Sequence, residues 1–254
     1  MFFPEHNASS APAAHPTFSW RKSFDSLSAA APWNWVDFFS FIFLFLAVAL
    51  FVGSTATYFS APHHAAWRIL IQSAAYVLWL IFTAHLFCKR TQKKWLPPLP
   101  QIFPAVGKAI LIAFILFPLI GMINFLWTFL LQKIGISFEQ QASIRFFGEL
   151  QTFGGKFLFV VLSVGIAPIV EEVVFRGMLL PLCIRKWGAL LGVLNSTAIF
   201  VLLHFHLGSC VPLFLFSAAL ALIYVRTRQL LIPIFLHILF NAATLLVYFW
   251  TASI

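Results

Sequence analysis

Acidic side chains are scarce in this sequence. Only seven of its 254 residues are Asp or Glu, and charged residues of both signs make up 9% of the chain, against roughly 25% in a typical soluble domain. So few charges cannot cover a water-facing surface, which excludes a soluble globular domain. Hydrophobic residues make up 61% of the chain, and we therefore expect an integral membrane protein with the lipid bilayer as its surroundings.

Cysteines are few as well, and they form no motif. Cys88, Cys183 and Cys210 are an odd number and are scattered in or beside apolar segments, which indicates neither a disulfide framework nor a CxxC metal site. The net charge of +9 does not indicate a nucleic-acid partner. Its basic residues lie in short loops between apolar runs rather than on one soluble face.

Long apolar runs fill most of the chain, and a helix needs about 20 residues to cross a bilayer. The expected fold class is all-α, a multi-pass transmembrane helical bundle of about seven spans. The expected segments are 35–59, 69–88, 105–131, 157–182, 189–206, 211–225 and 231–250. Between them, segment 137–152 alternates polar and apolar residues at helical spacing, which predicts an interfacial helix.

Three regions are expected along the chain. Residues 1–32 are rich in Ala, Ser, Pro and His and predict a flexible N-terminal tail. Residues 33–135 hold N-terminal transmembrane helices without a recognisable motif. Residues 136–254 form a transmembrane core that contains every candidate functional residue.

Basic residues are unevenly divided between the two sides that seven spans define. The side of the N terminus has Arg21, Lys22, Lys89, Arg90, Lys93, Lys94, Lys108, Arg185, Lys186, Arg226 and Arg228, and the other side has Arg68, Lys133, Arg145 and Lys156. Cytoplasmic loops carry the excess of Lys and Arg. We therefore expect a cytoplasmic N terminus, in a bacterial cytoplasmic membrane.

Two adjacent carboxylates, Glu171 and Glu172, lie deep inside an apolar segment together with Arg176. A charge at the bilayer centre costs about 2.5–3.5 kcal/mol even on the lenient insertion scale, so such residues are usually functional. Glu172 and Arg176 are four apart and share a helix face, while Glu171 points about 100° away. This spacing predicts a structural ion pair of Glu172 with Arg176 and leaves Glu171 as a general base. The alternative is a purely structural ion pair that holds helices together.

Two later segments supply polar groups. His204 follows Phe200 by four residues, and His237 and Asn241 are four apart and project from one helix face. Both groups of the latter pair need partners that lipid cannot supply. A single histidine near a helix end is more often an interfacial or core residue, and we interpret His85 and His206 in this way.

Taken in order, the three motifs resemble the CPBP family of intramembrane proteases, which includes type II CAAX prenyl endopeptidases and bacteriocin-processing and immunity proteins. They stand here as EExxxR at 171–176, FxxxH at 200–204 and HxxxN at 237–241, and the stretch RTRQLLIPIFLH also resembles the family. The resemblance covers roughly residues 150–250. It implies an endopeptidase that acts on a peptide or protein substrate, prenylated or not.

The resemblance also implies roles for single residues. Glu171 would activate water with the help of His204, and His237 and Asn241 would donate hydrogen bonds to the oxyanion of the tetrahedral intermediate. Glu172 and Arg176 would support the site.

Metal dependence stays open at this point. A zinc ion held by Glu171, His204 and His237 is a plausible alternative. The sequence favours a metal-free site, because the chain has no HExxH and because a zinc site would leave Asn241, a poor zinc ligand, without a role.

Two other classes of function compete with the protease. A proton-coupled transporter would use the same ionisable residues as a relay, although neither paired broken helices nor an inverted repeat is recognisable. A non-enzymatic bacteriocin-immunity protein is the second rival. One expectation also conflicts with a single site, because the predicted spans place His204 and His237 at different depths.

Overall fold

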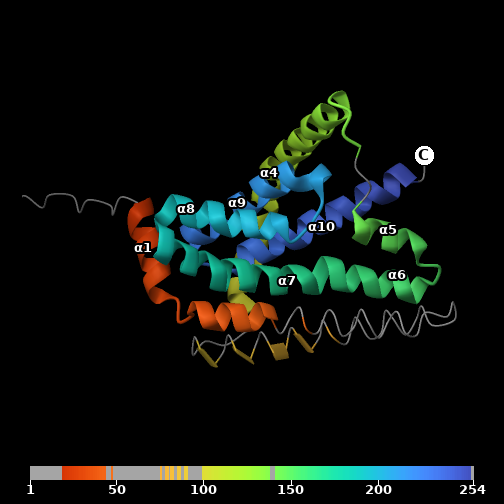
Figure 1. Cartoon of the computed structure of the whole chain (residues 1–254). Coiled ribbons are helices and arrows are strands. Elements are labelled where there is room, and N and C mark those ends of the chain that lie inside the picture. The colour runs from red at the N-terminus through yellow and green to blue at the C-terminus, as the bar shows by residue number, and fades with distance from the viewer. Residues whose placement is uncertain are drawn as a thin grey trace, which may run out of the picture.

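The computed structural model describes residues 19–43, 99–137 and 141–252, together with residue 47 and isolated positions between 75 and 90. In these parts every regular element is a helix and none is a strand (Figure 1), which confirms the predicted all-α class. The predicted spans 35–59 and 69–88 lie largely outside the described residues. The elements in chain order are α1 (Trp20–Ala30), α4 (Leu99–Lys133), α5 (Ala142–Glu149), α6 (Phe153–Val160), η2 (Val161–Ile166), α7 (Ala167–Glu172), η3 (Val173–Leu179), α8 (Leu180–Leu202), η4 (Leu207–Ser209), α9 (Cys210–Thr227) and α10 (Leu231–Ala252).

Four helical segments are long and apolar enough to cross a membrane. They are Pro100–Lys133, Phe153–Leu202, Leu207–Thr227 and Leu231–Thr251. The protein is therefore an integral membrane protein. Four spans are found within the described residues, so the predicted number of about seven is not confirmed.

The 50-residue segment from Phe153 to Leu202 turns back on itself at Gly188. This residue has φ 78° and ψ 178°, which breaks the helix inside α8 and suits a residue without a Cβ. Beyond the turn the two arms pack tightly, since a Cβ on Gly192 would lie 2.6 Å from the Cα of Ile184. Gly188 thus separates the first arm, predicted at 157–182, from the second arm, predicted at 189–206.

Each of the two π-helical segments in the first arm precedes a proline. η2 ends two residues before Pro168, and η3 ends two residues before Pro181. A proline cannot donate a backbone hydrogen bond to the carbonyl four residues earlier, so the ladder is interrupted and wider turns form in front of it. Such π-bulges occur frequently at functional sites, and here they flank the short helix α7 that carries both glutamates.

The N-terminal helix α1 packs against α8 and α9 at one end of the bundle (Figure 1). Arg185 donates hydrogen bonds to the backbone carbonyls of Ser28, Ala31 and Trp33. Arg228 donates to the backbone carbonyl of Ser23 and to the hydroxyl of Ser26.

The predicted flexible tail therefore does not extend to residue 32. Residues 20–30 form α1 because Phe24 and Leu27 are buried against the bundle, while residues 1–18 lie outside the described part of the chain. The contacts of Arg185 and Arg228 also gather these basic residues with Arg21 and Lys22 at one end, as the sequence predicts.

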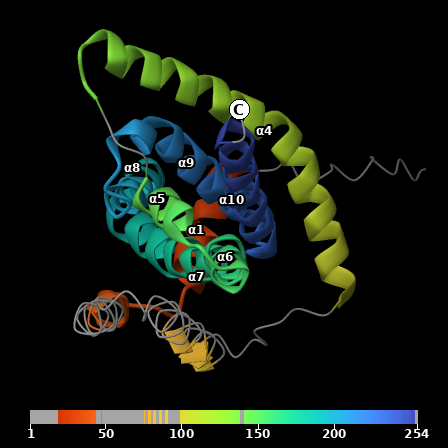
Figure 2. The same ribbon diagram turned by 90° about the vertical axis from the view of Figure 1, so that its right-hand side faces the viewer.

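Helix α10 has neighbours on several sides. It packs against α4, α9, α7 and η2, and α4 runs along the outside of the bundle (Figure 2). Within segment 137–152, residues Ala142–Glu149 form α5, whose Phe147 is buried against Phe159 and Tyr248. That this helix lies at the membrane interface stays a prediction. The contact of α10 with α7 brings the first and third sequence motifs together.

Candidate active site

Helix α7 presents its two glutamates to different surroundings. The Glu172 side chain is completely buried, whereas that of Glu171 is 31% exposed. Consecutive residues on a helix point about 100° apart, which explains the difference. The structure thus places one carboxylate inside the bundle and leaves the other partly exposed.

Arg176 holds the buried carboxylate in place. Its Nη1 lies 2.8 Å from Glu172 Oε1, and its Nη2 donates to both the carbonyl and the hydroxyl oxygen of Ser217, each at 3.0 Å. The guanidinium also lies over the Phe200 ring, 4.9 Å from its centroid. The predicted pair of Glu172 and Arg176 is confirmed, and a buried charge pair needs such additional hydrogen bonds to offset its loss of hydration.

His237 connects both glutamates across the interface between α7 and α10. Its Nδ1 lies 2.9 Å from Glu172 Oε1, and its Nε2 lies 3.7 Å from Glu171 Oε2. Since an ionised carboxylate only accepts hydrogen bonds, Nδ1 carries the proton of this bond. The ring is buried beside Phe200 and Phe216, so its orientation is fixed with Nε2 toward Glu171.

Asn241 lies one turn further along α10. Its Nδ2 donates to the backbone carbonyl of Ser163 in η2 at 2.9 Å. A side-chain amide nitrogen has two N–H groups, so one donor is engaged here and one is left for a further acceptor.

His204 lies just beyond the end of α8. Its Nδ1 is 2.8 Å from the carbonyl oxygen of Phe200, and because a carbonyl only accepts, Nδ1 carries the proton and Nε2 keeps its lone pair. Within the described part of the chain, His204 makes no hydrogen bond or ion pair with Glu171, His237 or Asn241. It is separated from His237 by Phe200, whose ring centroid lies 4.6 Å from one imidazole and 6.0 Å from the other.

The hairpin at Gly188 removes the conflict in depth between the two histidines. Gly192 meets Ile184, and Phe200 meets Arg176. This antiparallel register places position 204 level with Glu172. The register does not support the expected difference in depth, which came from taking 189–206 as a span of full membrane thickness.

Three polar atoms near this network are buried without a hydrogen-bond partner among the described residues. They are Glu171 Oε2, Glu172 Oε2 and Thr197 Oγ1. Glu171 Oε2 is the oxygen that faces Nε2 of His237. Sequence reasoning missed Thr197, Ser217 and Ser163; the signal for Ser217 was a hydroxyl in the middle of an apolar segment.

The metal alternative fits these residues poorly. Among the residues that the structure describes, no three His, Cys, Asp or Glu side chains are grouped closely enough to hold a metal ion. Glu171 and His237 approach each other, but His204 does not complete a three-ligand set of the kind that catalytic zinc requires. The mechanism proposed below therefore uses only groups of the chain itself.

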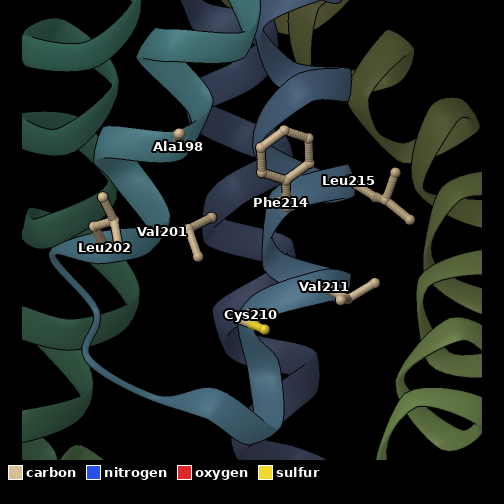
Figure 3. Close-up of a pocket in the computed structure, with 7 residues that line it drawn as sticks. All are labelled: Ala198, Val201, Leu202, Cys210, Val211, Phe214 and Leu215. Carbon is tan, nitrogen blue, oxygen red and sulfur yellow. The ribbon is translucent and has the colours of Figure 1, made fainter.

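A cavity of about 380 Å³ lies between α8 and α9 (Figure 3) and is separate from these residues. None of the six candidate residues lines it. Its walls are Ala198, Val201, Leu202, Cys210, Val211, Phe214 and Leu215. With apolar walls and no ionisable pair, it is not where we place the chemistry.

Comparison with known proteins points to one family. Residues 153–243 match the family described as type II CAAX prenyl endopeptidase Rce1-like, and this range contains all six candidate residues. The chain is also similar to the protein named "Putative membrane peptidase YdiL" of Bacillus subtilis (strain 168), with 29% identity over 84 residues, which are 33% of this chain and 34% of that protein. The chain thus aligns with about a third of the length of this curated relative. No solved structure matches it.

These matches confirm the resemblance to the CPBP family of intramembrane proteases. The matched range begins with α6 and ends within α10, and it includes the Gly188 hairpin and both glutamates.

Proposed function

We propose that this protein is an intramembrane endopeptidase in which Glu171 activates water. The observation that carries the proposal is the position of Glu171, a partly exposed carboxylate 3.7 Å from a buried histidine. That histidine is bonded by Glu172, which Arg176 holds in turn. A base, an oriented partner and a third group that fixes the partner are the recurring parts of hydrolytic sites. The match to an endopeptidase family supports the same reading.

In the first step, Glu171 removes a proton from water, and the water oxygen attacks the carbonyl carbon of the peptide. His204 helps to position this water through the lone pair on Nε2, because its Nδ1 is occupied by the carbonyl of Phe200. The tetrahedral intermediate then collapses, the C–N bond breaks, and Glu171 returns the proton to the leaving amine. The products are a carboxylate and an amine.

His237 and Asn241 stabilise the oxyanion of the intermediate. Asn241 retains one N–H beside its bond to Ser163. His237 donates from Nε2 when that nitrogen carries a proton as well as Nδ1, so the proposal requires the doubly protonated ring during turnover. Preorganised donors in a dry site are typically worth about 2.7–4 kcal/mol each.

The substrate is a peptide or protein that reaches the site at membrane depth, with or without a prenyl group. We propose that the end of the bundle with α1, Arg185 and Arg228 faces the cytoplasm, because cytoplasmic loops carry the excess of basic residues. A bacterial cytoplasmic membrane remains the proposed location.

The decisive experiment compares the two functions in one preparation. The purified protein is placed in liposomes, and cleavage of membrane-inserted reporter peptides and proton flux are both measured for the wild type and Glu171→Ala. Proteomics of membrane fractions with and without Glu171→Ala then identifies the peptides that fail to be trimmed. We expect cleavage that disappears in the variant; proton flux without cleavage would instead favour the transporter.

A further inference from the structure

The connection between α8 and α9, residues 203–209, carries His204 outside regular helix, and we call it the His204 loop. Helix ends fray because their last carbonyls lack partners in the helix. Phe205, the next residue, has φ 46°, a conformation that is a genuine outlier for a bulky side chain. Such a conformation persists only where the surroundings hold it. Something outside α8 must therefore fix this loop.

The first fixed point comes from α4. The indole Nε1 of Trp127 donates to the carbonyl oxygen of Leu207 at 3.0 Å, and α4 packs against η4 at the same place. An indole has this one donor and no acceptor. The bond therefore sets where the backbone of the loop passes along α4.

The second fixed point comes from the residue before α5. Nε2 of Gln141 donates to Ser209 Oγ at 3.0 Å, and the same hydroxyl lies 2.9 Å from Nδ1 of His206. The hydroxyl thus accepts from one side chain and bonds another inside the loop. Gln141, Ser209 and His206 form a chain of hydrogen bonds that ends two residues from His204.

Both tethers begin outside the region that matches the family, since residues 127 and 141 precede residue 153. The loop itself lies within that region. From this arrangement we infer that Trp127, Gln141 and Ser209 are positioning residues, which hold His204 where it orients the attacking water. The inference rests on the proposed function, and it gives the segment before residue 153 a part in the catalytic geometry.

The first test separates positioning from folding by steady-state kinetics. Trp127→Phe and Gln141→Leu each remove one hydrogen bond, and Ser209→Ala removes the bonds of its hydroxyl to Gln141 and His206. In each variant kcat should fall between about 5-fold and 100-fold with KM nearly unchanged, as small misplacements of a catalytic group do. Ser209→Thr keeps the hydroxyl and should restore kcat to within about 3-fold of the wild type. The double variant of Gln141→Leu with Ser209→Ala should lose no more than the worse single variant, because both remove the same bond.

Matched controls are available on neighbouring surfaces. Thr128→Val removes a hydroxyl that bonds only carbonyls of its own helix, and Trp250→Phe changes an exposed indole on α10. Both should keep wild-type kcat. Unchanged kcat in all three tether variants, or an equal loss in the controls, would overturn the inference.

The second test does not need activity. Phe205 is 90% exposed, so a spin label on Phe205→Cys, in full-length protein whose other cysteines are replaced, reports the mobility of the loop. Gln141→Leu and Trp127→Phe should increase that mobility, and Thr128→Val should not. Equal mobility of the label in all variants would overturn the inferred positioning role of Trp127 and Gln141, even if the enzyme is active. A wild type that cleaves nothing would instead overturn the proposed function. The two failures are therefore distinguishable.

Discussion

His237 and Glu172 are 65 residues apart in the chain, yet Nδ1 of the one lies 2.9 Å from Oε1 of the other. The same carboxylate oxygen binds Arg176. Glu172 is therefore more than the partner of an arginine on its own helix, because it also sets the orientation of the imidazole that faces Glu171. Supporting groups of this kind fix the tautomer and the direction of a histidine.

The base is tested most directly by Glu171→Gln. The amide has the same shape but cannot take up a proton, so proteolysis should be abolished while membrane insertion and purified yield stay nearly unchanged. The measurement is turnover of a reporter peptide by purified protein, with Asp25→Asn on the exposed face of α1 as the control. Activity above a few per cent of the wild type would move the role of base to Glu172.

The buried ion pair should show itself in stability as well as activity. Arg176→Ala leaves Glu172 without its cation in a site that is completely buried, and removal of one partner of a buried pair costs about 3–5 kcal/mol. We expect lower yield and a lower apparent Tm in detergent, whereas Lys108→Ala on the exposed face of α4 should change neither.

A second change on the Arg176→Ala background tests the pairing itself. Glu172→Gln removes the stranded charge and keeps an oxygen that accepts from Nδ1 of His237, so part of the yield should return. A double variant that is less stable than Arg176→Ala alone would show that the two residues are not energetic partners.

Asn241 tests the oxyanion site and the metal alternative together. Asn241→Ala should lower turnover by roughly 10²–10³-fold with little change in KM, because the donor acts mainly in the transition state. Asn241→Asp places a carboxylate against the oxyanion and should be at least as inactive. Since Asn241 also donates to the backbone of Ser163, Ser163→Ala, which leaves that carbonyl in place, serves as the control and should keep activity.

The same variants examine the metal. A carboxylate at position 241 is a competent zinc ligand, so a zinc enzyme could keep activity in Asn241→Asp. We expect the wild type to survive exhaustive chelation and to contain no stoichiometric metal by elemental analysis. Loss of activity on chelation with recovery on added zinc would contradict the metal-free mechanism while leaving the protease assignment intact.

The tight hairpin predicts a large difference between two glycines. A Cβ at Gly192 would lie 2.6 Å from the backbone of Ile184, whereas one at Gly121 in α4 meets nothing within 4 Å. Gly192→Ala should therefore spread the two arms, lower the apparent Tm and reduce activity, because Phe200 and His204 follow on the second arm. Gly121→Ala should leave both unchanged or raise stability slightly, since alanine is the better helix former; equal effects of the two variants would contradict this close packing.

Local spacing was enough to predict several features of the site. The separation of Glu171 from Glu172 and the pair of Glu172 with Arg176 follow from helical periodicity, which the sequence displays directly. The same periodicity predicted a helix over 137–152, of which residues 142–149 are helical. The flexible tail was predicted too long, since α1 gains its order from burial against α8 and α9 and not from its own composition.

The sequence by itself determined the membrane environment, the helical class and the resemblance to a family of intramembrane proteases, because these depend on composition and on spacings within single helices. Only the tertiary structure decided that His237 bonds Glu172, that Ser217 binds Arg176, and that His204 lies level with α7. These relationships join residues on different helices, and they depend on a turn at Gly188 and on wide turns before Pro168 and Pro181. Helical periodicity shows which residues share a helix face, but which other helix that face contacts depends on how the helices pack.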